Sequence, residues 1–178
     1  MSQSTDAIDA AALRKVQAPL KQRYRSDPRA ARTPIVAEAD FRDPGITCTV
    51  PTWAGPVRAG LHRATGGDGD DACSGDMLLQ ALVGCVGVTL RSVATVMGIA
   101  VRAARLRAEG AFDARGTLGV DKDVPVGVTD VVVTIEVDCD ADDARLQRLE
   151  TATERYCVVG RSLAQPPRIV VRRMAPAS

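Results

Sequence analysis

Two cysteines are the residues of this chain whose types and surroundings best suit chemistry. Cys85 lies inside a long apolar segment, and Cys157 follows a segment with helical periodicity and precedes Val-Val-Gly. Disulfide chemistry needs two thiols and a means of ionising one of them, because the thiolate is the nucleophile. If the fold brings the two sulfurs within reach, they are an attacking thiolate and its resolving partner. The first hypothesis is therefore a thiol peroxidase.

The cysteines also have simpler interpretations. Cys48 and Cys139 alternate with apolar neighbours as residues of a half-buried strand do, so we expect both to be packing residues. Cys73 lies in a loop rich in Gly and Asp, where we expect exposure and no role. Cys85 could likewise be a packing residue, because a cysteine among Ala, Val and Gly is commonly a small buried hydrophobe.

Metal binding and hydrolase chemistry have less support. A metal site would draw on His62, Cys73, Cys85 and Cys157, but the chain has no C-x-x-C or H-x-x-x-H spacing. A Cys-His-Asp hydrolase or transferase is weaker still, because His62 is the only histidine and no nucleophile elbow accompanies it. The sequence therefore predicts no metal site.

For Cys85 to react, a positive charge must stabilise its thiolate. A helix dipole acts within the first turn, and Cys85 lies about eleven residues, or roughly 16 Å, beyond the expected helix start. The candidates are Arg63 and Arg58 ahead of the helix and Arg161 near Cys157. A guanidinium stays protonated and lowers the pKa of a neighbouring thiol. The alternative for each arginine is a solvated surface position.

Composition limits the class of protein. A chain of 178 residues with 46% hydrophobic and 25% charged residues can form one globular domain with a core. The net charge is +1, Lys and Arg form no continuous run, and aromatic residues are few, so we expect no nucleic-acid partner. Five cysteines at irregular spacings behind a polar N-terminus disfavour a secreted disulfide scaffold. The longest apolar stretch, Met77 to Leu90, is short for a membrane span, so we expect a cytoplasmic protein with no membrane partner.

The chain divides into an N-terminal helical extension, residues 1–31, and a domain over residues 32–178. Residues 6–24 have the composition of a helix, which Pro19 should kink or end. Three antiparallel strands are expected over 34–41, 46–52 and 56–62, and Asp-Pro-Gly forms a turn between the first two.

A loop over 64–75 leads into the helix that carries Cys85, expected over 75–98 with Ser74 as its N-cap. This helix is apolar nearly all round, so the rest of the fold should wrap around it. Gly84 and Gly87 flank Cys85, and each costs the helix about 1 kcal/mol relative to alanine. A second helix or a substrate should therefore pack closely against this turn.

The remaining elements complete an α+β domain. Two pairing strands are expected over 101–111 and 131–137, and a short helix over 158–164 precedes a last strand over 168–174. Asp140 is the expected cap of a helix over 141–156, whose core face is formed by Leu146, Leu149, Ala152 and Tyr156.

Two segments of this pattern resemble the OsmC/Ohr family of osmotically inducible and organic-hydroperoxide-resistance proteins. They are HRATGGDGDDACSGDMLLQALVGCVGVTLRSVA, from His62 to Ala94, and the later ERYCVVGRSL. The similarity spans about residues 32–174. It implies antiparallel sheets wrapped around long central helices in an intertwined homodimer, with two active sites at the subunit interface.

The resemblance also implies roles for residues. Cys85 is the peroxidatic cysteine and Cys157 the resolving one, so the sulfenic acid formed at Cys85 condenses to a Cys85–Cys157 disulfide that a dithiol reduces. No metal or organic cofactor is implied. Among the arginines, Arg63 is the expected activator.

Two positions depart from the family pattern. The family carries a Glu ten residues before the reactive cysteine to orient an arginine, and this chain has Gly75 there. Asp76 is adjacent, but it falls on the opposite helix face from Cys85, so a loop acid, Asp68, Asp70 or Asp71, would have to replace the Glu. The usual Cys-Pro-x-Ser is replaced by Cys157-Val-Val-Gly. These changes indicate a divergent subfamily.

The leading expectation is a thiol-dependent peroxidase that prefers organic hydroperoxides, because Cys85 has apolar surroundings. Its partners would be the hydroperoxide and a dithiol reductant. The alternative is a non-catalytic member of the same fold that binds a small apolar molecule at the dimer interface, for which the missing Glu is the motivation. A slow redox sensor is a third possibility.

Overall fold

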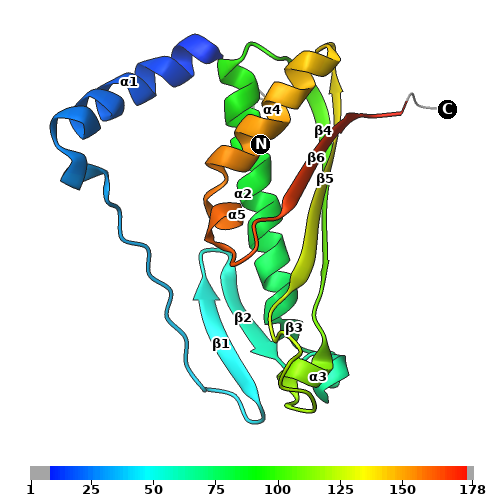
Figure 1. Ribbon diagram of the computed structural model, residues 1–178. Helices are drawn as coiled ribbons and strands as arrows, with labels where there is room; N and C mark the ends of the chain where they lie inside the picture. The colour runs from blue at the N-terminus through cyan, green and yellow to red at the C-terminus, as the bar shows by residue number, and fades with distance from the viewer. Residues whose placement is uncertain (1–8, 176–178) are drawn as a thin grey trace, which may run out of the picture.

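The longest element of the structure is helix α2, Ser74–Val96, and the other elements are arranged along it (Figure 1). The structure is a computed structural model that describes residues 9–175. The first residues of the expected N-terminal helix, 6–8, lie outside the described residues. The fold is α+β, as expected, and α2 begins and ends within two residues of its expected bounds.

Helix α2 buries one face only. Leu82, Val86, Leu90 and Ala94 recur every fourth residue and are buried against β4, α4 and α5. On the other side Val88 is 73% exposed and Val96 51% exposed. The expectation that the rest of the fold wraps around this helix is therefore wrong for a single chain, which covers one face and leaves the apolar remainder in contact with water.

A three-stranded sheet covers the buried face of α2. Its order is β4 (Val101–Ala111), β5 (Thr129–Cys139) and β6 (Arg168–Arg173), with β4 antiparallel and β6 parallel to β5. Alternate residues of β5 point into the core, and they include Val133, Ile135 and Val137. The period of two that predicts this strand is confirmed, as is its pairing with β4.

A second sheet is formed by the hairpin β1 (Thr47–Thr52) and β2 (Gly55–Gly60) with the short strand β3 (Ala72–Cys73). The strand expected over 34–41 does not form. Residues 32–46, here called the arm, are mostly extended and meet β1 at the Asp40–Thr49 bridge and at Asp43, whose carboxylate accepts a hydrogen bond from the Thr49 hydroxyl at 2.6 Å. Figure 1 shows the arm running from the N-terminal helix to the foot of the hairpin. Strand-forming side chains such as Ile35, 91% exposed, have no neighbouring strand in this chain to pair with.

Several local predictions are corrected. Pro19 lies inside α1 (Ala10–Ser26) and does not end it. The N-cap of α2 is Cys73, not Ser74, and it makes no side-chain capping bond. Asp142 caps α4 (Asp143–Tyr156), because Asp140 pairs with Arg102 instead.

The core face of α4 also differs from the prediction at one end. Leu146 and Leu149 are buried, but Thr153 completes the buried stripe and Tyr156 is 60% exposed. The remaining elements are α5 (Val158–Ser162), a one-turn helix α3 (Ala114–Thr117), and the 3-10 turns η1 (Pro28–Ala31) and η2 (Arg63–Thr65).

Candidate active site

The junction of α4 and α5 positions Cys157. This residue ends α4 and is the N-cap of α5, and its side chain is fully buried. The Gly160 N–H donates a hydrogen bond to the Cys157 sulfur at 3.3 Å. A Cβ at Gly160 would lie 3.3 Å from that sulfur and 3.3 Å from Pro167, so the glycine allows α5 to sit close to both. The Val-Val-Gly sequence thus folds as a turn that faces α2.

Cys85 lies halfway along α2 and meets this turn. Its side chain is half-buried and packs against the core cluster that contains Cys157, and each of the two thiols shifts the pKa of the other. Both cysteines are free thiols in this structure. The two residues that the sequence selects are therefore brought together, one partly open to solvent and one sealed in the core.

The surroundings of Cys85 favour its thiolate. Burial raises the pKa of this thiol, but hydrogen bonds to the sulfur more than offset that effect and leave the pKa below its usual value. The donors are the Val159 N–H, the Cys157 thiol, the Val158 N–H and the Thr89 hydroxyl. The polar groups at the start of α5 therefore favour the thiolate of Cys85. The N-terminus of α2 is too distant to have this effect.

The pKa of Cys157 is shifted in the opposite direction. Burial raises the pKa of the Cys157 thiol, and the neighbouring Cys85 raises it further, against the lowering effect of the Gly160 N–H. A buried, protonated thiol beside a partly exposed, ionisable one is the asymmetry expected of a resolving and an attacking cysteine.

The arginines lie elsewhere in this chain. Arg63 begins η2, and its side chain lies over Gly69 in the loop before α2. Arg58 on β2 is held by Asp71, with Nε 2.5 Å from the carboxylate. Arg161 is exposed on α5. No arginine is among the groups that dominate the pKa of Cys85. Arg63 as activator stays a prediction, and a second chain would have to bring it to the thiol.

His62 and Cys73 line a different cavity, of about 250 Å³, together with Asp76 and Phe112. The His62 ring stands edge-to-face on Phe112, and its Nδ1 accepts a hydrogen bond from the Ala64 N–H. Within residues 9–175, no group of three or more His, Cys, Asp or Glu side chains is arranged to hold a metal ion. Cys139 is buried in the core and Cys48 is half-buried on β1.

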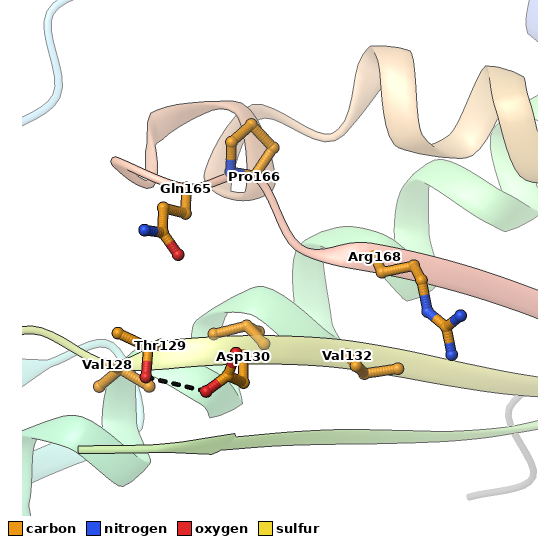
Figure 2. Close-up of a pocket in the computed structure, with 8 residues that line it drawn as sticks. Val128, Thr129, Asp130, Val132, Gln165, Pro166 and Arg168 are labelled. Atoms are coloured by element: carbon orange, nitrogen blue, oxygen red, sulfur yellow. Dashed lines mark hydrogen bonds between the residues drawn. The ribbon is translucent and has the colours of Figure 1, made fainter. Parts of the chain in front are cut away.

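A further cavity, of about 240 Å³, lies between the start of β5 and the loop before β6 (Figure 2). Gln165 and Arg168 reach over it from the β6 side. Asp130 on the β5 side has a φ of 54° and accepts a hydrogen bond from the Thr129 hydroxyl at 3.2 Å. No cysteine lines this cavity, so it is separate from the thiol pair.

Sequence reasoning missed the groups that act on Cys85. It looked for a cationic side chain, whereas the dominant donors include two backbone amides and Thr89. Backbone amides cannot be identified as donors from residue types, because every residue except proline has one. Thr89 could have been identified, because it lies four residues after Cys85 and so one turn along the same helix face.

A scan against protein families matches residues 67–172 to the OsmC-like protein family. No curated protein matches the sequence at a significant level. Solved structures show the same fold over most of the chain. An OsmC-like protein from Mycoplasma pneumoniae is 12% identical with a TM-score of 0.63, and the match covers 80% of this chain and 96% of that one.

Two further structures carry names related to peroxide resistance. An organic hydroperoxide resistance protein from Elizabethkingia anophelis is 13% identical with a TM-score of 0.63, covering 80% of this chain and 99% of that one. An organic hydroperoxide resistance protein OsmC from Legionella pneumophila is 16% identical with a TM-score of 0.58, covering 82% and 99%. At these identities the likeness concerns the fold.

Proposed function

Because the chain belongs to the OsmC-like protein family, we propose that it is a thiol-dependent peroxidase that reduces organic hydroperoxides. The observation that carries the proposal is the contact between Cys85 and Cys157. Their opposite pKa shifts make one thiol ready to attack and keep the other protonated until it is needed.

The first step is attack by the Cys85 thiolate on a peroxide oxygen. The sulfur forms an S–O bond with the terminal oxygen, the O–O bond breaks, and the alkoxide takes a proton to leave as an alcohol. Cys85 becomes a sulfenic acid. The exposed part of α2 next to Cys85 is formed by Gly84, Ala81 and Val88, which are uncharged, so an alkyl or aryl group on the peroxide is favoured there.

The second step is resolution by Cys157. Its sulfur attacks the sulfur of the Cys85 sulfenic acid, and water leaves as the disulfide forms. A dithiol then reduces this disulfide and is itself oxidised. A cytoplasmic location would supply such reductants.

The functional unit is a homodimer in this proposal. The accessible surface of the chain is 13,039 Å². A folded monomer of 18.8 kDa is expected to expose about 8,300 Å². The eleven terminal residues outside the described range account for at most about 1,750 Å² of the difference, at the value for an unfolded chain. An excess of about 3,000 Å² per chain remains, or about 6,000 Å² for two chains, which is comparable with the largest obligate interfaces.

The second copy also gives Arg63 a role. Within residues 9–175 this guanidinium forms no salt bridge, whereas that of Arg58 is paired with Asp71. We assign to Arg63 the stabilisation of the partner's Cys85 thiolate across the interface, since an unpaired guanidinium lowers the pKa of a thiol more effectively than a neutralised one.

The proposal is tested by peroxide consumption with cumene hydroperoxide and a dithiol reductant. The wild-type protein should turn over, and Cys85→Ser should not. Mass spectrometry after one equivalent of peroxide should find a Cys85–Cys157 disulfide. Unchanged thiols would instead support a non-catalytic binder of apolar molecules, and a disulfide without turnover would support a slow redox sensor.

A further inference from the structure

Charge is separated along this molecule, although its net charge is only +1. Residues 10–32, which form α1 and η1, contain seven Lys or Arg and one Asp, a net charge of +6. Helix α1 buries none of its residues. Within residues 9–175, none of these seven cations forms a salt bridge. We call this segment the basic helix.

The opposite charge gathers at the other end of α2. Residues 62–76 and 112–130 contain eight Asp against three Lys or Arg, a net charge of −5. The two segments lie together, because His62 packs on Phe112 and both line one cavity with Asp76. We call them the acidic end. The rest of the chain contains thirteen basic and thirteen acidic residues and is neutral.

The two charged regions are too far apart to stabilise each other within one chain. Helix α2 separates them and spans about 34 Å, against a Debye length of about 8 Å at physiological salt. Figure 1 shows α1 beside the C-terminal end of α2, while β3 and α3 lie near its N-terminal end. The cations of α1 therefore repel one another without compensation from the same chain.

The uncovered face of α2 lies between these regions. Gly84 is at its middle, and a Cβ built there would meet nothing within 4 Å. A helix from a second chain can therefore approach this backbone closely, and a two-fold axis through the middle of α2 makes the face self-complementary. The excess accessible surface of the chain, described above, requires such a cover.

Charge decides between the two possible arrangements. If the α2 helices of two copies run parallel, the two basic helices lie near each other and so do the two acidic ends, so that like charges repel. If they run antiparallel, each C-terminal end of α2 lies beside the N-terminal end of the other, and each basic helix reaches the partner's acidic end. We propose that the dimer is antiparallel and that the basic helix clasps the acidic end of the second copy. This inference rests on the homodimer of the proposed function.

The arm allows the basic helix to reach a second copy. It joins the basic helix to the hairpin as an extended segment whose apolar side chains are exposed, including Ile35 and Val36. The family match begins at residue 67, so the basic helix and the arm precede the matched part of the chain.

Carbodiimide cross-linking tests the arrangement directly, because it joins a Lys amine to a carboxylate in contact with it. The chain has three lysines: Lys15 and Lys21 in α1, and Lys122 at the acidic end. In an equimolar mixture of ¹⁴N and ¹⁵N protein, Lys15 or Lys21 should link to Asp residues of the acidic end in peptides of mixed isotope. Lys122 is the internal control, since its own loop supplies carboxylates. Links of α1 within one chain only would overturn the clasp.

Charge reversal tests how strongly the clasp stabilises the dimer. Lys21→Glu with Arg25→Glu on α1, or Asp121→Lys with Asp123→Lys at the acidic end, should each raise the dimer dissociation constant at least tenfold at low salt. All four changes together should restore most of the affinity. Arg148→Glu with Arg168→Glu is the matched control, because it makes the same charge change at exposed positions of the neutral part.

The outcomes are distinguishable. A wild-type chain that stays monomeric in analytical ultracentrifugation removes the homodimer and the clasp together. A dimer that is insensitive to both reversals leaves the homodimer standing and overturns the clasp. Co-sedimentation with phosphatidylglycerol vesicles that is lost in the Lys21→Glu, Arg25→Glu variant, with the dimer unchanged, would assign the basic helix to an anionic lipid surface and also overturn the clasp.

Discussion

The hydroxyl of Thr89 lies one turn of α2 beyond Cys85 and lowers the pKa of the Cys85 thiol by acting as a donor toward its sulfur. Thr89→Val keeps the shape of the side chain and removes this donor, so the pKa of Cys85 should rise. The thiolate fraction at pH 7 should fall, and alkylation by iodoacetamide should slow by roughly three- to tenfold. The rate should still increase with pH, along a curve displaced to higher pH. Thr95→Val, on the same helix but bonded to the Arg91 carbonyl, should leave the curve in place.

The Val158 N–H is a second donor to Cys85, and proline can remove it without removing α5. Position 158 is the first residue of this helix, where proline is well tolerated, and Cys157 before it is extended, as a residue before proline prefers. Val158→Pro should therefore raise the pKa of Cys85 and slow its alkylation at pH 7, with far-UV circular dichroism unchanged. Val158→Ala retains the amide and should behave as wild type. Equal loss in both variants would mean that the Val158 side chain matters and not its N–H.

Cys157→Ser should separate the two chemical steps. The first equivalent of hydroperoxide should be consumed at a rate close to wild type, because Cys85 still attacks. Turnover with a dithiol should fall steeply, and a Cys85 sulfenic acid should be trapped by dimedone. Cys73→Ser, in the cavity with His62, is the control and should keep full turnover. If Cys157→Ser keeps the wild-type turnover, Cys157 is not the resolving residue.

Arg63→Ala should slow peroxide reduction by about tenfold and raise the pKa of Cys85, because it removes a cation that we assign to the partner's thiolate. Arg58→Ala is the matched comparison, since its guanidinium is neutralised by Asp71 and its loss should have a smaller effect on the thiol. The measurement is the pH dependence of the first turnover. If Arg58→Ala instead slows peroxide reduction more than Arg63→Ala does, the activating residue is Arg58, paired with Asp71.

Substitutions on the uncovered face of α2 should reveal the second copy. In a monomer, Gly84→Ala would stabilise the exposed helix by about 0.5 to 1 kcal/mol. In a dimer with a helix packed against this glycine, the same change should weaken association, and Val88→Glu should abolish it. Light scattering after size-exclusion chromatography reports the mass. Arg148→Glu, at an exposed position of α4 in the neutral part of the chain, should leave the dimer intact.

The elements of the domain could be read from the sequence where burial creates a pattern. Strand β5 and the buried face of α4 follow their periodicity, and the Gly/Asp loop marks the start of α2. The strand expected over 34–41 is absent for a physical reason. A strand needs a partner for its backbone groups as well as suitable side chains, and in one chain Ile35 and Val36 have none.

The candidate site stays a prediction. The choice of Cys85 and Cys157 depended on residue type, and the structure brings these two together. Their ionisation could not be read from residue types, because it depends on where the N–H groups of Val158 and Val159 point. The separation of charge could not be seen from residue counts, because the net charge is only +1. It becomes visible when the charged residues are located along the chain, where they form a basic helix and an acidic end.

The half-covered helix α2 links folding to concentration. Val88 and Val96 are exposed in one chain, so in the proposed dimer, where a second chain covers them, association would contribute to the stability of each protomer by mass action. The melting temperature should rise with protein concentration, and the specific activity should decline on dilution below the dissociation constant. Peroxide protection by this protein would then depend more than linearly on its abundance, and a cell that makes half as much would lose more than half of it.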